Sequence, residues 1–427
     1  MTKTLNRYSM FLLILLIGTS GASADQGVAT DAKSHAAIPD ATITIGKQAL
    51  VTDSQGRFNY EQTSGTVMAR ASGYRASSID SASLQKKGGV LQLEPFAPKA
   101  LYLTVYGIGS KSLREGALAL IKHGRVNSLV IDMKGDRGLI PYPSANSLAQ
   151  KNGARAITTI RNLPALISEL HQNGIYTIAR IVVFKDNPLA TSQPGLAVRH
   201  QNGSLFRDRE GLAWVDPFQA EVRKYNIDIA IEAAQVGFDE IQFDYVRFPD
   251  VSQKLRFAKD PTEAARVESI DRFLREAHDR LIPYNVFLAV DIFGYVCWNT
   301  NDTGIGQQLE HISNLVDYLS PMVYPSGYKY GIPGCSQPVS HPYEIVRDTL
   351  ENARARVNIS PKRFRPWLQV FRDYAFDHRS FGATELAEQV RAASDFGSDG
   401  WMLWNPRNRY EGLGLAPLPA VGGTLSH

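Results

Sequence analysis

The stretch GFDEIQFDYVRFPD, Gly237–Asp250, is an apolar run interrupted by charged and amide side chains. Side chains alternate along a β-strand, so Gln242 and Asp244 should point to the same side. The alternate positions should then pack against helices: Ile241, Phe243 and Tyr245. The pattern predicts a buried strand with one polar end, where Asp244 emerges. Asp239 and Glu240 belong to the opposite end, where we expect solvated or capping carboxylates.

Short apolar runs like this one recur after residue 100, separated by stretches with helical spacing. Eight of them are visible, beginning at Leu101, Ser128, Ile175, Glu240, Val286, Val316, Pro366 and Gly400. Eight strands alternating with helices over about 310 residues predict an α/β fold, a (β/α)8 TIM barrel, over residues 97–415. An open, doubly wound sheet is the alternative, but the glycine fingerprint of a dinucleotide site is missing. The last segment, PLPAVGGTLSH, has no helical period, so we expect the eighth helix to be missing or very short.

Residues 25–96 show a different pattern of short β-like runs. ATITIG, ALVTDSQGRFNY and TVMARASGY are separated by turn residues such as Asp53, Gly56 and Gly65. The pattern predicts a small all-β sandwich domain before the barrel. EPFAPKA, Glu94–Ala100, is the expected linker between the two.

Residues 1–24 have the three parts of a secretory signal peptide. Lys3 and Arg7 precede the apolar run MFLLILLIG, and ASA follows at residues 22–24. A membrane anchor is the alternative, but the run is shorter than the roughly 20 residues that span a bilayer. We therefore expect cleavage, a secreted or periplasmic mature protein, and no integral membrane segment after cleavage.

Charge and cysteine content limit the partners of the mature chain. The formal net charge is +4 and falls by two when Lys3 and Arg7 are removed, so we expect no nucleic-acid partner. Cys297 and Cys335 are the only cysteines. An oxidising compartment allows a disulfide between them, and two free buried thiols are the alternative.

The predicted strand ends carry many polar and aromatic side chains. In a TIM barrel, chemistry takes place at the C-terminal ends of the strands, whereas the strand interiors form a packed core. The residues at these ends are Tyr106, Asp132, Lys134, Arg180, Asp244, Arg247, Asp291, Tyr324, Gln369, Trp404 and Asn405. A barrel that is only a packed core does not need so many, so we expect a binding cleft there.

Two carboxylates at strand ends, with no metal-binding set beside them, suggest hydrolysis of a glycosidic bond. One carboxylate must attack or stabilise the oxocarbenium-like centre, and one acid must protonate the leaving oxygen. We expect Asp244 in the first role, kept ionised by Arg180 or Arg247 and oriented by Gln242. Asp291 is the expected general acid if burial raises its pKa; for either aspartate the alternative is a structural role. Substrate-positioning groups would be Asp132, Lys134, Arg180, Gln242, Arg247, Tyr324, Trp404 and Asn405.

Other chemistries find less support in the sequence. The nine histidines are scattered without zinc-ligand spacing, and no G-x-S-x-G elbow is present. GIGSKS, Gly107–Ser112, lacks the full spacing of a phosphate-binding loop and reads as the first strand-to-helix turn. We therefore expect no metal, no cofactor and no nucleotide.

Two motifs in the barrel portion carry a family resemblance. The segment Trp214–Asp250 resembles the fourth strand of TIM-barrel glycoside hydrolases and of a related bacterial family of unknown function, in which it reads DGI.fDY.RFP. VIDMKGDRGLIPY, Val130–Tyr142, is similar to their second-strand motif D.KD..G...Y, with Gly135 shifting the expected acid to Asp136. The resemblance covers Leu101–Arg409. It implies a TIM barrel, a carbohydrate substrate and these site residues: Asp132, Lys134, Asp244 and Arg247.

The N-terminal region has a resemblance of its own. IPDATITI, TDSQGRF and ASGY resemble the carboxypeptidase regulatory-like domain, which implies a non-catalytic accessory module. The sequence as a whole predicts an exported glycoside hydrolase acting on an envelope or extracellular polysaccharide. The alternative is a barrel that binds carbohydrate without cleaving it, because the aromatic residues would serve both. Whether cleavage retains or inverts configuration is open.

Overall fold

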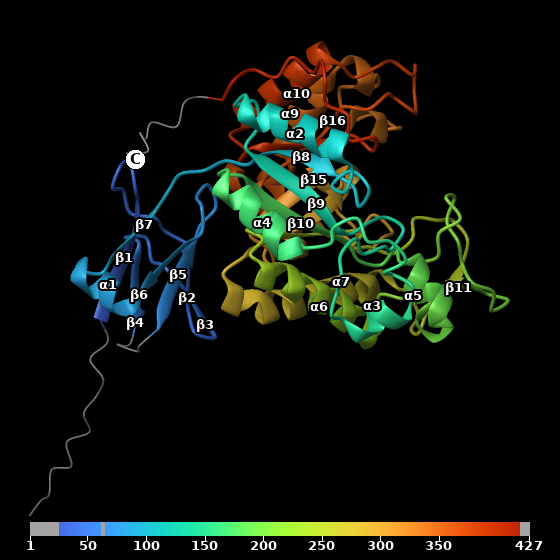
Figure 1. Cartoon of the computed structure of the whole chain (residues 1–427). Helices are drawn as coiled ribbons and strands as arrows, with labels where there is room; N and C mark the ends of the chain where they lie inside the picture. Colours follow the sequence, from blue (N-terminus) through green and yellow to red (C-terminus); the bar gives the residue numbers. More distant parts are fainter. Residues whose placement is uncertain (1–24, 61–64, 419–427) are drawn as a thin grey trace, which may run out of the picture.

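The computed structural model describes residues 25–60 and 65–418 (Figure 1). The predicted signal peptide, residues 1–24, lies outside the described residues. Among those that are described, no helix has both the length and the apolar character needed to cross a membrane.

The N-terminal region contains two small β-sheets packed around their own core. One sheet has the order β4-β1-β7 and the other β3-β2-β5-β6. Buried apolar residues between them include Ile43, Phe58, Val67 and Leu91. The short helix α1 (Ser81–Lys86) joins β6 to β7. The predicted all-β region is therefore confirmed, with these strands: β1 (Asp25–Asp31), β2 (Thr42–Ile45), β3 (Gln48–Val51), β4 (Arg57–Tyr60), β5 (Thr66–Arg70), β6 (Ser77–Asp80) and β7 (Val90–Leu93).

The rest of the chain forms a closed barrel of parallel strands, which confirms the predicted TIM barrel. Each strand pairs with its neighbour in chain order, and the last pairs with the first. All eight predicted strands are present: β8 (Lys99–Leu103), β9 (Ser128–Lys134), β10 (Tyr176–Val182), β12 (Glu240–Asp244), β14 (Phe287–Phe293), β15 (Tyr318–Met322), β16 (Trp367–Gln369) and β17 (Trp401–Trp404).

Helices connect the strands and cover the outside of the barrel (Figure 1). The longer ones are α2 (Lys111–Lys122), α4 (Leu163–Gln172), α6 (Ala220–Val236), α7 (Glu263–Leu281), α9 (Pro342–Val357) and α10 (Ala383–Phe396). Only the short α8 (Leu309–Ile312) lies between β14 and β15. After β17 the described chain, as far as residue 418, has no helix, as the aperiodic sequence predicts.

A buried ionic cluster lies at the N-terminal end of the barrel strands. Glu240, the first residue of β12, is fully buried and accepts hydrogen bonds from Arg365 and from the Tyr176 hydroxyl. Arg365 also pairs with Asp399 at 3.2 Å. The expectation of a solvated Glu240 is wrong, because the side chain points into the barrel. Asp239 takes the expected capping role, since it accepts the Thr177 N–H at 2.7 Å.

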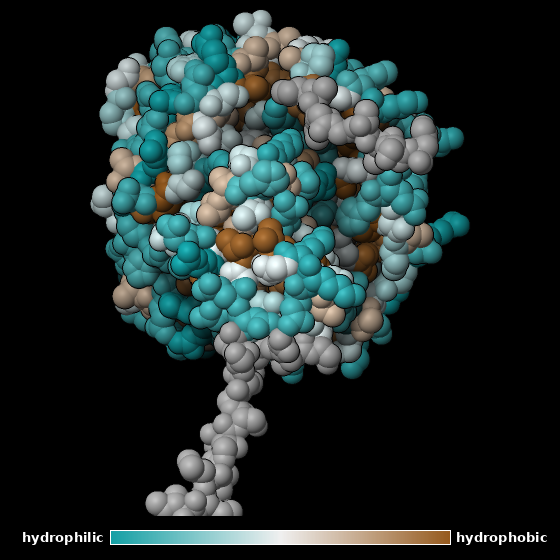
Figure 2. Space-filling model, turned by 90° about the vertical axis from the view of Figure 1, so that its left-hand side faces the viewer, coloured by the Kyte–Doolittle hydropathy of each residue, from teal (hydrophilic) through white to brown (hydrophobic). Residues whose placement is uncertain are grey.

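The N-terminal region docks against this same end of the barrel. The Gly73 N–H donates to the hydroxyl of Tyr318, which begins β15, and the Arg75 guanidinium lies 3.8 Å from the ring centroid of Phe96 in the linker. Arg70 pairs with Asp317 at 3.3 Å. The molecular face in Figure 2 is mainly hydrophilic where it is coloured, with hydrophobic residues in small separate patches. The opposite end of the barrel, where the strands finish, is left free for a binding site.

Candidate active site

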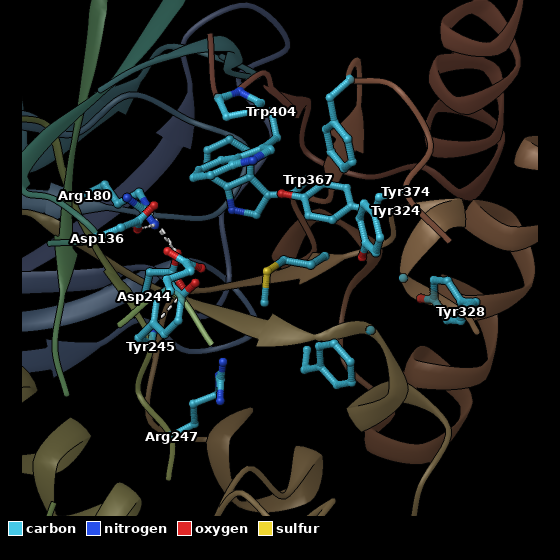
Figure 3. A pocket seen from close by; sticks show the side chains of 17 residues that line it. Asp136, Arg180, Asp244, Tyr245, Arg247, Tyr324, Tyr328, Trp367, Tyr374 and Trp404 are labelled. Carbon is cyan, nitrogen blue, oxygen red and sulfur yellow. Dashed lines mark hydrogen bonds and ion pairs between the residues drawn. The ribbon is translucent and has the colours of Figure 1, made fainter. Parts of the chain in front are cut away.

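A cavity of about 550 Å³ lies at the C-terminal ends of the barrel strands. Figure 3 shows two different walls. Asp136, Arg180 and Asp244 lie together on one side, and aromatic rings face them from the other. The aromatic wall consists of Tyr324, Trp367, Phe371, Tyr374 and Trp404. Because sugar rings combine hydroxyl groups with apolar faces, a cleft with one charged and one aromatic wall suits them.

The charged wall is organised by Arg180, a fully buried residue of β10. Its Nε and Nη2 donate to Asp244 Oδ2 at 3.0 and 2.5 Å. Nη1 donates to Asp132 Oδ1 at 2.7 Å, and Nη2 donates to Asp136 Oδ1 at 2.7 Å. One guanidinium therefore holds three carboxylates, of which Asp136 and Asp244 face the cavity. Although burial alone lowers the pKa of Arg180, the carboxylates around it raise that pKa well above its ordinary value.

Asp132 lies behind this wall and supports it. Its Oδ2 accepts the Tyr102 hydroxyl at 2.7 Å, and the Tyr102 ring stacks on Trp404 with centroids 4.1 Å apart. Burial raises the pKa of Asp132 to about 6, against the opposing effect of the Arg180 charge. Asp132 thus links the ion pairs of one wall to an aromatic ring of the other, without lining the cavity itself.

Asp244 is the last residue of β12, and its carboxylate is fixed at both oxygens. Besides the Arg180 contacts to Oδ2, its Oδ1 accepts the backbone N–H of Tyr245 at 2.6 Å. Tyr245 has φ of +51°, a conformation that costs energy for a residue with a side chain and is found at functional sites. The turn ends the strand alternation, so Tyr245 lines the cavity. Tyr245 also packs against the core between barrel and helices, so the prediction for this residue is incomplete: the ring has a second face on the cavity.

Asp291 lies below the cavity instead of on its wall. It is 1% exposed and is the fifth of the seven residues of β14, whereas Asp244 ends its strand. Its Oδ1 accepts the Trp367 indole N–H at 2.7 Å, and Oδ2 has no hydrogen-bond partner among the residues that the structure describes. Burial and then the Asp244 charge raise the pKa of Asp291 well above its ordinary value, as expected of an acid. The expected direct contact with substrate is not supported, because Trp367 stands between Asp291 and the cavity.

Arg247 lies on the cavity wall, but it does not bind Asp244. Its guanidinium lies 5.0 Å from the ring centroid of Trp214 and 4.9 Å from that of Tyr245. Its Nη1 donates to the Phe248 carbonyl at 3.2 Å. Of the two arginines expected to hold Asp244 ionised, Arg180 is therefore the partner.

Three other predicted site residues lie away from the cavity. Lys134 is buried, donates to Asp186 at 2.6 Å and faces the Tyr225 ring of α6. A register shift between β9 and β10 at Arg180 and Ile181 breaks the alternation that should have placed Lys134 beside Asp132. Gln242 donates to Ser320 inside the barrel and does not orient Asp244. The Asn405 amide donates to the Val370 and Arg409 carbonyls and holds a loop.

The two cysteines are free thiols in the structure, so the disulfide is not formed. Cys297 is fully buried in the barrel core, in the 3-10 turn after β14. Cys335 packs in a separate small cluster with Tyr328, Ile332 and Ile345. The alternative of two buried thiols is the one observed. Among the described residues, no group of three His, Cys, Asp or Glu side chains is arranged to hold a metal ion.

Several cavity residues were not singled out for the site from the sequence. Asp136 was marked only by the second-strand motif, and its side chain is 35% exposed. Glu210 comes from the long loop after β10 and pairs with Lys185 at 3.1 Å. Phe371 and Tyr374 follow β16 and stack nearly parallel, with centroids 6.1 Å apart. Such loop residues carry no periodic pattern, so only the fold brings them to the cavity.

A closed (β/α)8 barrel with carboxylates and aromatic rings facing one cavity is an architecture that glycoside hydrolases use. The chain belongs to the family described as "Putative glycosyl hydrolase domain", which matches residues 100–410. The match begins after the N-terminal region and gives that region no family.

The chain is also similar to several solved structures, of which the first named here shares its fold. The glycoside hydrolase domain of PgaB (BpsB) from Bordetella bronchiseptica is 14% identical, with a TM-score of 0.53, and the match covers 73% of this chain and 95% of that one. A hypothetical protein from Ruminiclostridium thermocellum is 37% identical over 45% of this chain and 96% of its own, with a TM-score of 0.40. The catalytic domain of a beta-amylase from Paenibacillus polymyxa is 10% identical over 76% and 96%, with a TM-score of 0.48. No curated protein sequence matches the chain.

Proposed function

We propose that the barrel hydrolyses glycosidic bonds in a polysaccharide, with Asp244 as the carboxylate that attacks or stabilises the sugar cation. The observation that carries the proposal is the position of Asp244. It stands at the end of β12 on the charged wall, its Oδ2 held by Arg180, and it faces an aromatic wall across the cavity. A carboxylate in this position can approach the anomeric carbon of a sugar stacked on the rings.

The general acid that we propose is Asp136, which has to carry a proton when substrate is bound, although its Oδ1 accepts from Arg180 in the free protein. It is the carboxyl group that shares Arg180 Nη2 with Asp244, so their acceptor oxygens are at most roughly 5 Å apart, near the separation found in retaining enzymes. It faces the cavity and is accessible, whereas Asp291 is screened by Trp367. Asp291 then acts from below: its raised pKa favours the uncharged form, which adds no second negative charge beneath Asp244.

Further parts of the proposal concern where the protein works. Residues 1–24 have the composition of a cleaved signal peptide, which favours export and an envelope or extracellular polysaccharide as substrate. The N-terminal sheets, which resemble a carboxypeptidase regulatory-like domain, would serve as an accessory module. They dock at the end of the barrel remote from the cavity, so a direct catalytic role for them has no geometric support.

A carbohydrate-binding barrel without activity is the second candidate. The observation in its favour is that Asp132 and Asp291, the two aspartates near the cavity whose pKa is raised, do not line it. The aromatic wall would serve binding equally well. The two candidates differ in one respect: only hydrolysis needs Asp244 as a reacting group.

The test is cleavage of a polysaccharide panel by the wild type and by Asp244→Asn, Asp136→Asn and Asp291→Asn. We expect Asp244→Asn to lose cleavage by at least about 10³-fold. Asp136→Asn should lose cleavage of polysaccharide but keep much of its rate on aryl glycosides, whose leaving groups need little protonation. If Asp291→Asn shows this leaving-group dependence and Asp136→Asn does not, the acid is Asp291. Binding without cleavage by the wild type would support the second candidate.

A further inference from the structure

Arg247 lies where two hollows of the surface meet. The active-site cavity and a second cavity of about 210 Å³ share three lining residues, Glu210, Tyr245 and Arg247. The segment that connects β10 to α6 forms much of the second cavity's lining, including Lys185 and Trp214. The two hollows are therefore parts of one cleft, and a saccharide longer than the first cavity would pass over Arg247.

The guanidinium of Arg247 packs against two aromatic rings. It lies 5.0 Å from the Trp214 centroid and 4.9 Å from the Tyr245 centroid, and these two rings contact each other with centroids 5.7 Å apart. The Trp214 ring is itself fixed, because its indole N–H donates to Asp208 Oδ2 at 2.9 Å. Only one Arg247 hydrogen bond is made within the described residues, to the Phe248 carbonyl. A planar guanidinium fixed in this way leaves N–H groups available to a ligand in the cleft.

Most carboxylates that line the two cavities beside Arg247 form their ion pairs with other cations. Asp208 and Glu210 both pair with Lys185, at 3.5 and 3.1 Å. The cavity carboxylates on the other side pair with Arg180. In the part of the chain that the structure describes, no carboxylate forms an ion pair with Arg247; Asp250 lines the outer edge of the second cavity but is exposed and does not pair with it.

We propose that Arg247 binds a carboxylate carried by the substrate, so that the polysaccharide contains an acidic sugar next to the residue that is cleaved. The inference rests on the proposed function, since it concerns the same cleft. A guanidinium fork matches the two oxygens of a carboxylate, and such charge-assisted pairs are stronger than hydrogen bonds to neutral hydroxyls. The two rings restrict the guanidinium from one side, which reduces the entropy lost on binding.

The experiment compares acidic polymers with their carboxyl-reduced forms. Hyaluronan, alginate, polygalacturonate and peptide-free peptidoglycan strands would serve as acidic probes, each paired with the same polymer after its carboxyl groups are reduced to alcohols. Binding is measured by calorimetry on full-length Asp244→Asn, and cleavage on the wild type. We expect at least one acidic polymer to bind roughly tenfold or more tightly than its reduced form.

Substitutions then assign this preference to one residue. Arg247→Gln should abolish the preference, and Arg247→Lys should retain part of it, because a lysine keeps the charge without the fork. Arg209→Gln is the matched control, since Arg209 lines the same second cavity but is exposed. It should leave the preference unchanged.

Each outcome supports or overturns the inference. Equal binding of acidic and reduced forms overturns it, as does failure of every acidic polymer to bind. Equal losses in Arg247→Gln and Arg209→Gln also overturn it, since they would reflect general charge attraction. The proposed function fails separately, if Asp244→Asn cleaves polymers as fast as the wild type. The preference measured by binding is still valid in that case.

Discussion

Replacing Arg180 with methionine should be one of the most damaging single changes in the barrel. The guanidinium is fully buried and holds Asp132, Asp136 and Asp244 at hydrogen-bond distance. Methionine has a similar length but no charge, so the carboxylates would be left close together without a cation. Removing one partner of a buried ion pair costs about 3 to 5 kcal/mol, and here several carboxylates lose the same partner. We therefore expect a loss of about 5 kcal/mol in the free energy of unfolding.

The loss should shrink on acidification. Without the guanidinium, the pKa of Asp132 should rise beyond its present value of about 6, because burial is no longer opposed by a positive charge. An acid whose pKa is raised in the native state stabilises the fold at low pH, and this stabilisation is lost as the pH rises through the native pKa. The effect is up to about 1.4 kcal/mol per pH unit for each proton. Wild type and variant should thus differ less at about pH 5 than at about pH 7.

The assay is urea denaturation at these two pH values, with Arg247→Met as the matched control. Arg247 lines the same cavity, but it contacts rings and a carbonyl instead of carboxylates, so its loss should be below about 1 kcal/mol at either pH. Equal losses for the two variants, or a loss in Arg180→Met that does not depend on pH, would refute the assignment of Arg180 as the centre of the charged wall.

Three further predictions concern other parts of the site. Asp291→Asn should flatten the pH dependence of stability above about pH 4. The raised pKa of buried Asp291 makes the wild type lose up to about 1.4 kcal/mol of unfolding free energy per pH unit in that range, and asparagine does not titrate. Urea denaturation at several pH values measures this dependence. Tyr374→Ala should weaken saccharide binding by about 1 kcal/mol in calorimetry with little change in Tm, since Tyr374 is 62% exposed and stacks on Phe371 at the cavity. Reductant should leave the Tm unchanged and thiol titration of unfolded protein should find two thiols, because Cys297 and Cys335 are free; a drop in Tm with reductant would show a disulfide.

The fold was predictable because its pattern is repeated. Each strand from β8 to β17 in the barrel contains an apolar run, and the stretch around Asp244 has the alternation of a strand with one polar end. The same pattern could not fix where each strand stops. The alternation of the sequence predicts that Asp291 and Asp244 both point into the barrel. In the structure β14 continues to Phe293 and leaves Asp291 buried, whereas β12 stops at Asp244. An error of two residues in a strand end thus separates a cavity residue from a buried one.

The remaining misses arise from contacts between distant segments. The register shift beside Lys134 and the left-handed backbone of Tyr245 both break alternation locally, and neither has a marker in its own sequence. Glu240 can be buried because Arg365, which lies just before β16 and far away in the sequence, is its ion-pair partner. Pairings of this kind depend on the closed barrel. They are visible only when all eight strands are in place.

The most direct test of the central claim is the cleavage rate of Asp244→Asn on a polysaccharide that the wild type hydrolyses. Asparagine keeps the size of the side chain but offers one acceptor oxygen, so it cannot serve both the Tyr245 N–H and Arg180. A thermal melt must therefore show that the variant is folded before its rate is compared. We expect saccharide binding comparable with that of the wild type, and a rate lower by at least about 10³-fold. A folded variant that binds the polymer and cleaves it at the wild-type rate would show that Asp244 is not the reacting carboxylate.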